Sequence, residues 1–122
     1  MRQERGHLPG GLVINEELEL LGSVGGNVTV GEGGKLYLRG TIYGDLIIDR
    51  GARVHIFGQI QGTVTVHKHS KVVHSGVIGG DLINEGGRLF VEKISKVGGK
   101  VKTLSGRTKV ESAGARMPPP ED

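Results

Sequence analysis

The side chains best suited to chemistry in this sequence are its histidines, three of which lie close together at His67, His69 and His74. Two imidazoles spaced as in His67-Lys68-His69 can ligate a divalent metal ion, but a protein site normally needs at least three ligands. No third ligand stands at a convincing spacing, and the positive charge of Lys68 opposes a dication. We therefore predict no metal site, and the sequence assigns no role to these histidines.

Catalytic motifs are not evident. The chain contains no Cys, so it has neither a thiol nucleophile nor thiolate metal ligands. It shows no nucleophile elbow, no phosphate-cradling P-loop and no carboxylate pair in an evident cleft. These observations predict a protein that is not an enzyme, with no cofactor and no small-molecule substrate.

Cations recur at a nearly constant spacing, at Lys35, Arg53, Lys71 and Arg88, and we call them the cation column. Like charges stacked on one face repel each other, so such a column indicates an anionic partner, such as nucleic acid, acidic lipid or an acidic protein surface. Few aromatic residues interleave with these cations, which makes nucleic acid an unlikely partner. A membrane surface is a weaker candidate, and a solvated face neutralised by neighbours such as Asp49 is the alternative.

A second column is largely apolar and consists of Tyr37, His55, Val73 and Phe90, which we call the outer column. Strand alternation predicts that these residues point outward, because their neighbours at both sides are the better core residues. Tyr43 and Phe57 are expected to point outward as well. A contiguous patch of this kind usually marks an interface, whereas scattered surface hydrophobes would be the alternative.

The element that must position these columns is an 18-residue repeat, which runs from Gly22 to Gly80. Glycine recurs at residues 22, 40, 58 and 76, and again at residues 26, 44, 62 and 80. Aliphatic residues recur every six positions within it. The unit from residue 76 is one residue short near Asn84, and Asn84 and His74 fall in otherwise aliphatic columns. Asn84 is expected to form a corner at this deletion.

Each repeat unit contains three short segments in which apolar and polar residues alternate, separated by Gly, Asp or Asn. Alternation with period two indicates strands, and no segment has helical periodicity. Three strands in each unit predict an all-β, triangular parallel β-helix of about six rungs. We expect a flexible tail over residues 1–9, the β-helix over residues 10–111 and a Pro-rich tail over residues 112–122.

Composition agrees with a narrow aliphatic core, since the chain has 23 Gly among 122 residues but only two Phe, two Tyr and no Trp. Residues 1–34 carry five acids and two bases, whereas residues 88–116 carry eight bases and two acids. An acidic end and a basic end favour head-to-tail association of copies, although the two tails could instead fold over the ends. The absence of a signal peptide and of a long apolar run predicts a cytoplasmic location.

The segments GTIYGDLIIDRGARVHIFGQIQGTVTV (40–66) and GVIGGDLINEGGRLFV (76–91) resemble the bactofilins, a family of bacterial polymer-forming proteins. The resemblance covers residues 10–111 and implies a right-handed triangular β-helix that self-assembles. The chain differs from the family in its short tails and in the NEGG segment at residues 84–87. Hexapeptide-repeat acyltransferases share the six-residue period, but Leu36-Tyr37 and Val54-His55 depart from their pattern.

Three functions follow as hypotheses. The leading one is a bactofilin-like structural scaffold that partners with itself through rung ends and the outer column. The alternative is a small module that binds one protein partner, such as an immunity protein that neutralises a bacterial toxin. The third is an acyltransferase-like trimer with His55 or His74 at a subunit interface.

Overall fold

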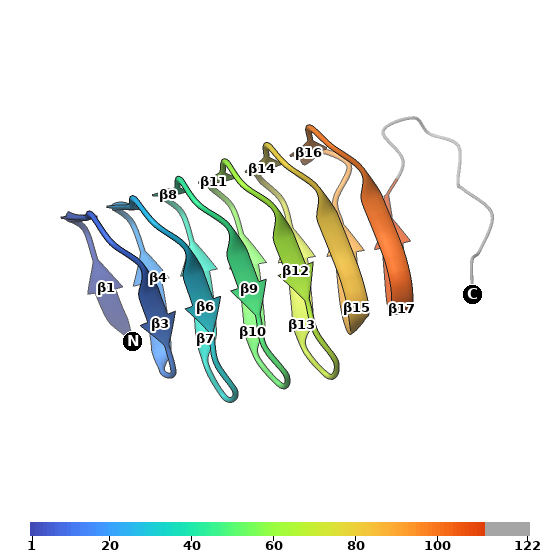
Figure 1. Cartoon of the computed structure of the whole chain (residues 1–122), viewed down its shortest axis with the longest axis horizontal. Coiled ribbons are helices and arrows are strands. Elements are labelled where there is room, and N and C mark those ends of the chain that lie inside the picture. The colour runs from blue at the N-terminus through green and yellow to red at the C-terminus, as the bar shows by residue number, and fades with distance from the viewer. Residues whose placement is uncertain (112–122) are drawn as a thin grey trace.

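The computed structural model describes residues 1–111, which form seventeen β-strands and no helix. Consecutive rungs stack along one axis, and every strand pairs in parallel with the equivalent strand of the next rung (Figure 1). In Figure 1 the chain runs down the near side, up the far side and forward over the top, while the rungs advance from left to right. The molecule is therefore a right-handed parallel β-helix of about six rungs, as the repeat and the resemblance predicted.

Three faces make up the triangular cross-section. The first face contains β3 (Leu12–Ile14), β6 (Val28–Val30), β9 (Leu46–Ile48), β12 (Val64–Val66) and the first parts of β15 (Leu82–Val91) and β17 (Val101–Val110). The second contains β1 (Arg2–Glu4), β4 (Glu17–Leu20), β7 (Lys35–Leu38), β10 (Arg53–Ile56), β13 (Lys71–His74) and the second parts of β15 and β17. The third contains β2 (His7–Leu8), β5 (Ser23–Val24), β8 (Thr41–Ile42), β11 (Gln59–Ile60), β14 (Val77–Ile78) and β16 (Lys96–Val97).

The core is a bundle of aliphatic columns, one residue from each rung. On the first face, for example, Val28, Leu46, Val64 and Leu82 are in direct register and are fully buried. The strict alternation of buried and half-exposed residues along each strand produces these columns, since side chains of a strand alternate between faces. Burial of such aliphatic side chains is the main stabilising contribution, at about 1.5–3 kcal/mol for each residue.

The corners between the third and first faces explain one glycine column and one polar column. A Cβ atom at Gly44 would run into the carbonyl oxygen of Gly26 in the preceding rung, so only glycine permits this stacking distance. Beside it, polar side chains bond backbone amides of the next rung: Asp45 N–H donates to Asn27 Oδ1 and Thr63 N–H to Asp45 Oδ1, both at 2.8 Å. These bonds connect rungs at a point where the strand ladder is interrupted.

The N-terminus differs from the expectation. Residues 1–9 were predicted to be a tail outside the β-helix, but β1 pairs with β4 and β2 pairs with β5, so these residues form the start of the solenoid. The 18-residue register hid this, because His7 pairs with Ser23 at a spacing of only 16 residues. The predicted Pro-rich tail at residues 112–122 lies outside the described residues.

Candidate functional site

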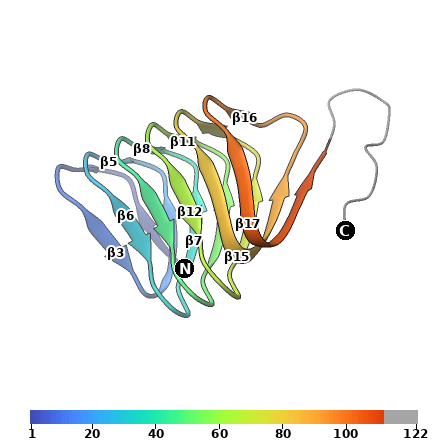
Figure 2. The same cartoon turned by 45° about the vertical axis from the view of Figure 1, so that its right-hand side comes forward.

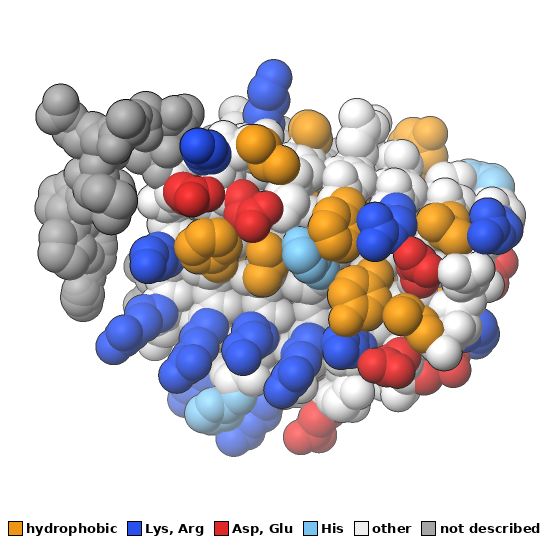
Figure 3. All heavy atoms as spheres, turned by 180° about the vertical axis from the view of Figure 1, so that it is seen from behind, with side chains coloured by type: hydrophobic (Ala, Val, Ile, Leu, Met, Phe, Trp, Pro, Cys, Tyr) orange, Lys and Arg blue, Asp and Glu red, His pale blue; other side chains and the backbone are white. Residues whose placement is uncertain are grey.

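The cation column exists as predicted and lies along the second face. Strand register places Lys35 beside Arg53, Arg53 beside Lys71, and Lys71 beside Arg88. The column continues to Arg107 in the last rung and is preceded by Glu17. Figure 3 shows this row of Lys and Arg side chains along the lower part of the face. Adjacent rungs are about 4.8 Å apart, a spacing at which unit charges in water repel by roughly 1 kcal/mol.

Most of these charges have no internal partner. Lys35 Nζ lies 3.6 Å from Glu17 Oε2 and 5.4 Å from the centre of the Tyr37 ring, so Lys35 is paired at the N-terminal end of the column. Within residues 1–111, no salt bridge or side-chain hydrogen bond satisfies Arg53, Lys71 or Arg88. The unpaired part of the cation column therefore consists of its last three members, Arg53, Lys71 and Arg88.

These three cations border an open hollow of about 310 Å³, which we call the basic hollow. Its lining consists of Arg53, His69, Ser70, Lys71, Gly86, Gly87 and Arg88. The hollow forms where rung five, residues 76–92, is one residue short. Rungs two to four make a tight turn at this corner, whereas rungs five and six run through it as the single ten-residue strands β15 and β17.

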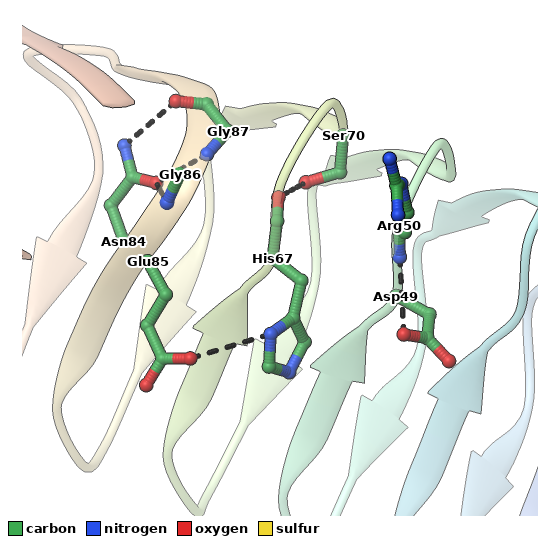
Figure 4. A network of polar contacts seen from close by, with 8 residues as sticks. All are labelled: Asp49, Arg50, His67, Ser70, Asn84, Glu85, Gly86 and Gly87. Atoms are coloured by element: carbon green, nitrogen blue, oxygen red, sulfur yellow. Dashed lines mark hydrogen bonds and ion pairs between the residues drawn. The ribbon is translucent and has the colours of Figure 1, made fainter. Parts of the chain in front are cut away.

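Asn84 makes the irregular corner of rung five possible. Its buried side chain accepts hydrogen bonds from the N–H groups of Gly86 and Gly87, at 3.1 and 2.8 Å, and donates to the carbonyl oxygen of Gly87 at 3.0 Å (Figure 4). Its Nδ2 also lies 3.0 Å from the carbonyl oxygen of Arg107 and from Thr108 Oγ1, so the two N–H groups of the amide are shared among three acceptors. Asn84 thus replaces a tight backbone turn with side-chain bonds, as its place at the deletion suggested.

The neighbouring corner in rung four contains an unusual backbone conformation. His69 has φ of 62°, in the left-handed region that Gly33 and Gly51 occupy at the corresponding corners. A residue with a Cβ atom adopts this region at a cost of roughly 1–2 kcal/mol. Strain of this kind is often found at functional positions, and His69 lines the basic hollow.

The outer column also exists as predicted, since Tyr37, His55, Val73 and Phe90 follow one another in register. All four side chains are half-buried rather than fully exposed. Tyr43 and Phe57, also predicted to point outward, are exposed. The outer column and Phe57, which stacks on His55, form an apolar band, and Figure 3 shows hydrophobic side chains directly above the row of cations.

A chain of polar and aromatic contacts links this band across four rungs. Arg39 Nε lies 2.6 Å from Glu19 Oε2, and the Arg39 guanidinium lies 4.4 Å from the centre of the Phe57 ring. Phe57 stacks on His55 at 3.8 Å between ring centres, and His55 Nε2 lies 3.2 Å from Ser75 Oγ. Burial lowers the pKa of His55, so its imidazole is neutral near pH 7. This network was not predicted from the sequence, because its contacts between rungs join residues that are 18 to 20 positions apart.

The two ends of the solenoid are less different in charge than composition suggested. At the N-terminal end, Glu16 is paired with Arg2, Glu17 with Lys35 and Glu19 with Arg39. Hydrogen bonds from Gln3 and Arg39 lower the pKa of Glu19. The acidic character expected of this end is thus largely compensated within the first rungs.

The C-terminal end exposes core positions. Val101 and Val110 of β17 are in register with the buried residues Leu82 and Val91, yet they are 40% and 47% exposed. The outer edge of β17 has no partner strand within residues 1–111, as Figure 2 shows. Thr103 and Thr108, also in core columns, bond each other through their hydroxyls at 2.7 Å. The end is therefore partly apolar and partly polar.

His74 and His67 each contact another group of the solenoid. His74 is fully buried, as its column predicted, with Nε2 lying 3.0 Å from the carbonyl oxygen of Lys96. His67 Nδ1 lies 3.3 Å from Glu85 Oε1. Among residues 1–111, no three His, Asp or Glu side chains are close enough to share a metal ion.

Comparisons with protein-family models, with curated proteins and with solved structures gave no match to this chain. Within residues 1–111, no helix is long and apolar enough to cross a membrane.

Proposed function

We propose that this protein is a self-assembling, non-enzymatic β-solenoid scaffold, similar to the bactofilins, whose copies stack end to end in the cytoplasm. The observation that carries the proposal is the exposed C-terminal rung. Its strand β17 has an open edge in the described part of the chain, and core-column residues Val101 and Val110 are exposed on it. An open strand edge with apolar side chains is a template for further strand pairing.

The N-terminal rung offers a matching surface. Leu12 is the first residue of the column that ends at Val101, and Leu8 begins the column that ends at Val97. If a second copy continues the register, aliphatic residues meet in both columns. Contacts between unlike ends are heterologous and propagate into filaments when they do not close into a ring.

The test compares two valines with nearly equal exposure. Val101→Lys places a charge in the end contact, whereas Val77→Lys places the same charge on the side of the solenoid at a position that is 39% exposed. Sedimentation velocity over a range of concentrations, with negative-stain microscopy, should show filaments for the wild type and Val77→Lys but not for Val101→Lys. A wild type that stays monomeric at high concentration would refute the proposal, as would normal assembly of Val101→Lys.

The second candidate is a module that binds one protein partner, for example an immunity protein that covers a toxin. The apolar band beside the cation column supports it, because rigid aromatic residues next to Arg are typical of protein interfaces. Tyr37→Asp should then abolish a stoichiometric complex that Tyr43→Asp preserves, since Tyr43 lies beyond the end of β8, on the third face. Equal effects of the two variants would count against this face as the interface.

A further inference from the structure

We propose that the basic hollow is a binding site for a phosphate-type oxyanion. The site lies on the side of the solenoid, at the corner between the first and second faces, so it does not depend on end-to-end assembly. It would give the protein a ligand that its repeat alone does not indicate.

The charges of the hollow are the first argument. Arg53, Lys71 and Arg88 come from three consecutive rungs and border the same space. None of them makes a salt bridge to a carboxylate within residues 1–111. Stacking three cations in register is unfavourable without a counter-charge, so an anion in the hollow would remove the repulsion between them.

The shape of the corner is the second argument. Glu85 is the acid nearest in sequence to the hollow, but its carboxylate is directed at His67 and does not line the space (Figure 4). Gly86 and Gly87 line the hollow without side chains, and their N–H groups are already bonded to Asn84. The donors left for a ligand are therefore the charged groups and the imidazole of His69.

His69 supplies the third argument. Its left-handed backbone conformation is strained, whereas Gly occupies the same corner in rungs two and three. An imidazole at this position adds a hydrogen-bond donor next to Lys71. The strain is explained if the side chain contributes to binding.

This set of donors fits a phosphate or sulfate group better than a carboxylate. Two guanidinium forks can each bond two oxygens of a tetrahedral oxyanion, while Lys71 acts as a point charge between them. The volume of about 310 Å³ and its open side leave room for a second linked phosphate. We therefore assign inorganic phosphate and pyrophosphate as the probes that represent the ligand.

The experiment titrates the full chain with pyrophosphate and with inorganic phosphate by calorimetry, at constant ionic strength set with sodium chloride. We expect saturable binding of one probe molecule per chain, and a rise in melting temperature that chloride does not give. Lys71→Gln should weaken binding about tenfold, since it removes one charge-assisted contact.

Lys102→Gln is the matched control, because Lys102 is an exposed lysine of β17 on the first face and is not part of the hollow. Both variants alter surface positions, so circular dichroism should show both folded. Equal weakening by the two substitutions would show binding to general positive charge and overturn the proposal. Failure of both probes to bind more tightly than chloride would overturn it as well.

Discussion

Replacing Asn84 by Val tests whether the shortened corner depends on this one side chain. Asn84 occupies the column of Val30, Ile48 and Val66, all fully buried. If burial in this aliphatic column alone determined stability, Asn84→Val would stabilise the fold by about 2 kcal/mol, because it replaces a polar residue by an apolar one. The structure predicts the opposite sign, because Asn84 holds the backbone of the corner.

The magnitude follows from the groups that would lose their partner. Gly87 is buried, and both its N–H and its C=O bond to the Asn84 side chain. Leaving a buried polar group unsatisfied costs roughly 1–3 kcal/mol, so the two groups together cost about 4 kcal/mol. Gly86 is only half-buried and water can replace its bond. After about 2 kcal/mol gained from burying Val, the net loss is about 2 kcal/mol.

Urea unfolding followed by circular dichroism measures this difference. With a typical slope for a small domain, the midpoint of Asn84→Val should fall by about 1 M. Ile48→Val is the control, since it lies in the same column and should cost only about 0.5–1.5 kcal/mol through a lost methyl group. A midpoint for Asn84→Val at or above that of the wild type would show that the side-chain bonds are dispensable.

Two further predictions concern histidines. His69→Gly should raise the free energy of unfolding by about 0.5–1 kcal/mol, because glycine removes the strain at φ of 62°, and a lower melting temperature would contradict this. Burial lowers the pKa of His74, although the hydrogen bond to the backbone of Lys96 opposes this shift. As the pH falls, His74 therefore takes up a proton in the unfolded chain before it does so in the folded protein. The urea midpoint should therefore decrease once the pH drops below about 6.5, the usual value for unfolded His, and the decrease should be smaller in His74→Gln; an equal decrease in both would assign the effect to other groups.

The fold was predictable from the sequence because the repeat is nearly exact where the core is regular. Lys35, Arg53 and Lys71 are 18 residues apart and lie side by side in the structure. The same spacing placed Tyr37, His55 and Val73 in one column. Each inference needed only the period of the repeat and the alternation of strands.

The sequence-based predictions were wrong or missing where the spacing between paired residues departs from 18. At the N-terminus, the 16-residue spacing between His7 and Ser23 concealed a rung that starts at Arg2. The basic hollow was also invisible, because it depends on how β15 crosses a corner without a tight turn. The pairing of Glu16, Glu17 and Glu19 could not be read from net charge, since it depends on which cation each carboxylate reaches.

The geometry of a solenoid explains why its recognition sites should lie at such irregularities. A regular rung presents the same spacing of about 4.8 Å again and again, so every position along the cation column would bind an anion equally well. Rung five differs from the regular rungs because one residue is missing at its corner. The Asn84 side chain bonds the backbone of Gly87 there, and the Glu85 carboxylate is directed to His67 and not to the hollow. Within residues 1–111, unpaired cations, a hollow and the strained His69 coincide only at the corner where rung five follows rung four. If the inference is correct, inserting one residue between Glu85 and Gly86 should restore the tight turn and abolish phosphate binding, while the strands on either side keep their register.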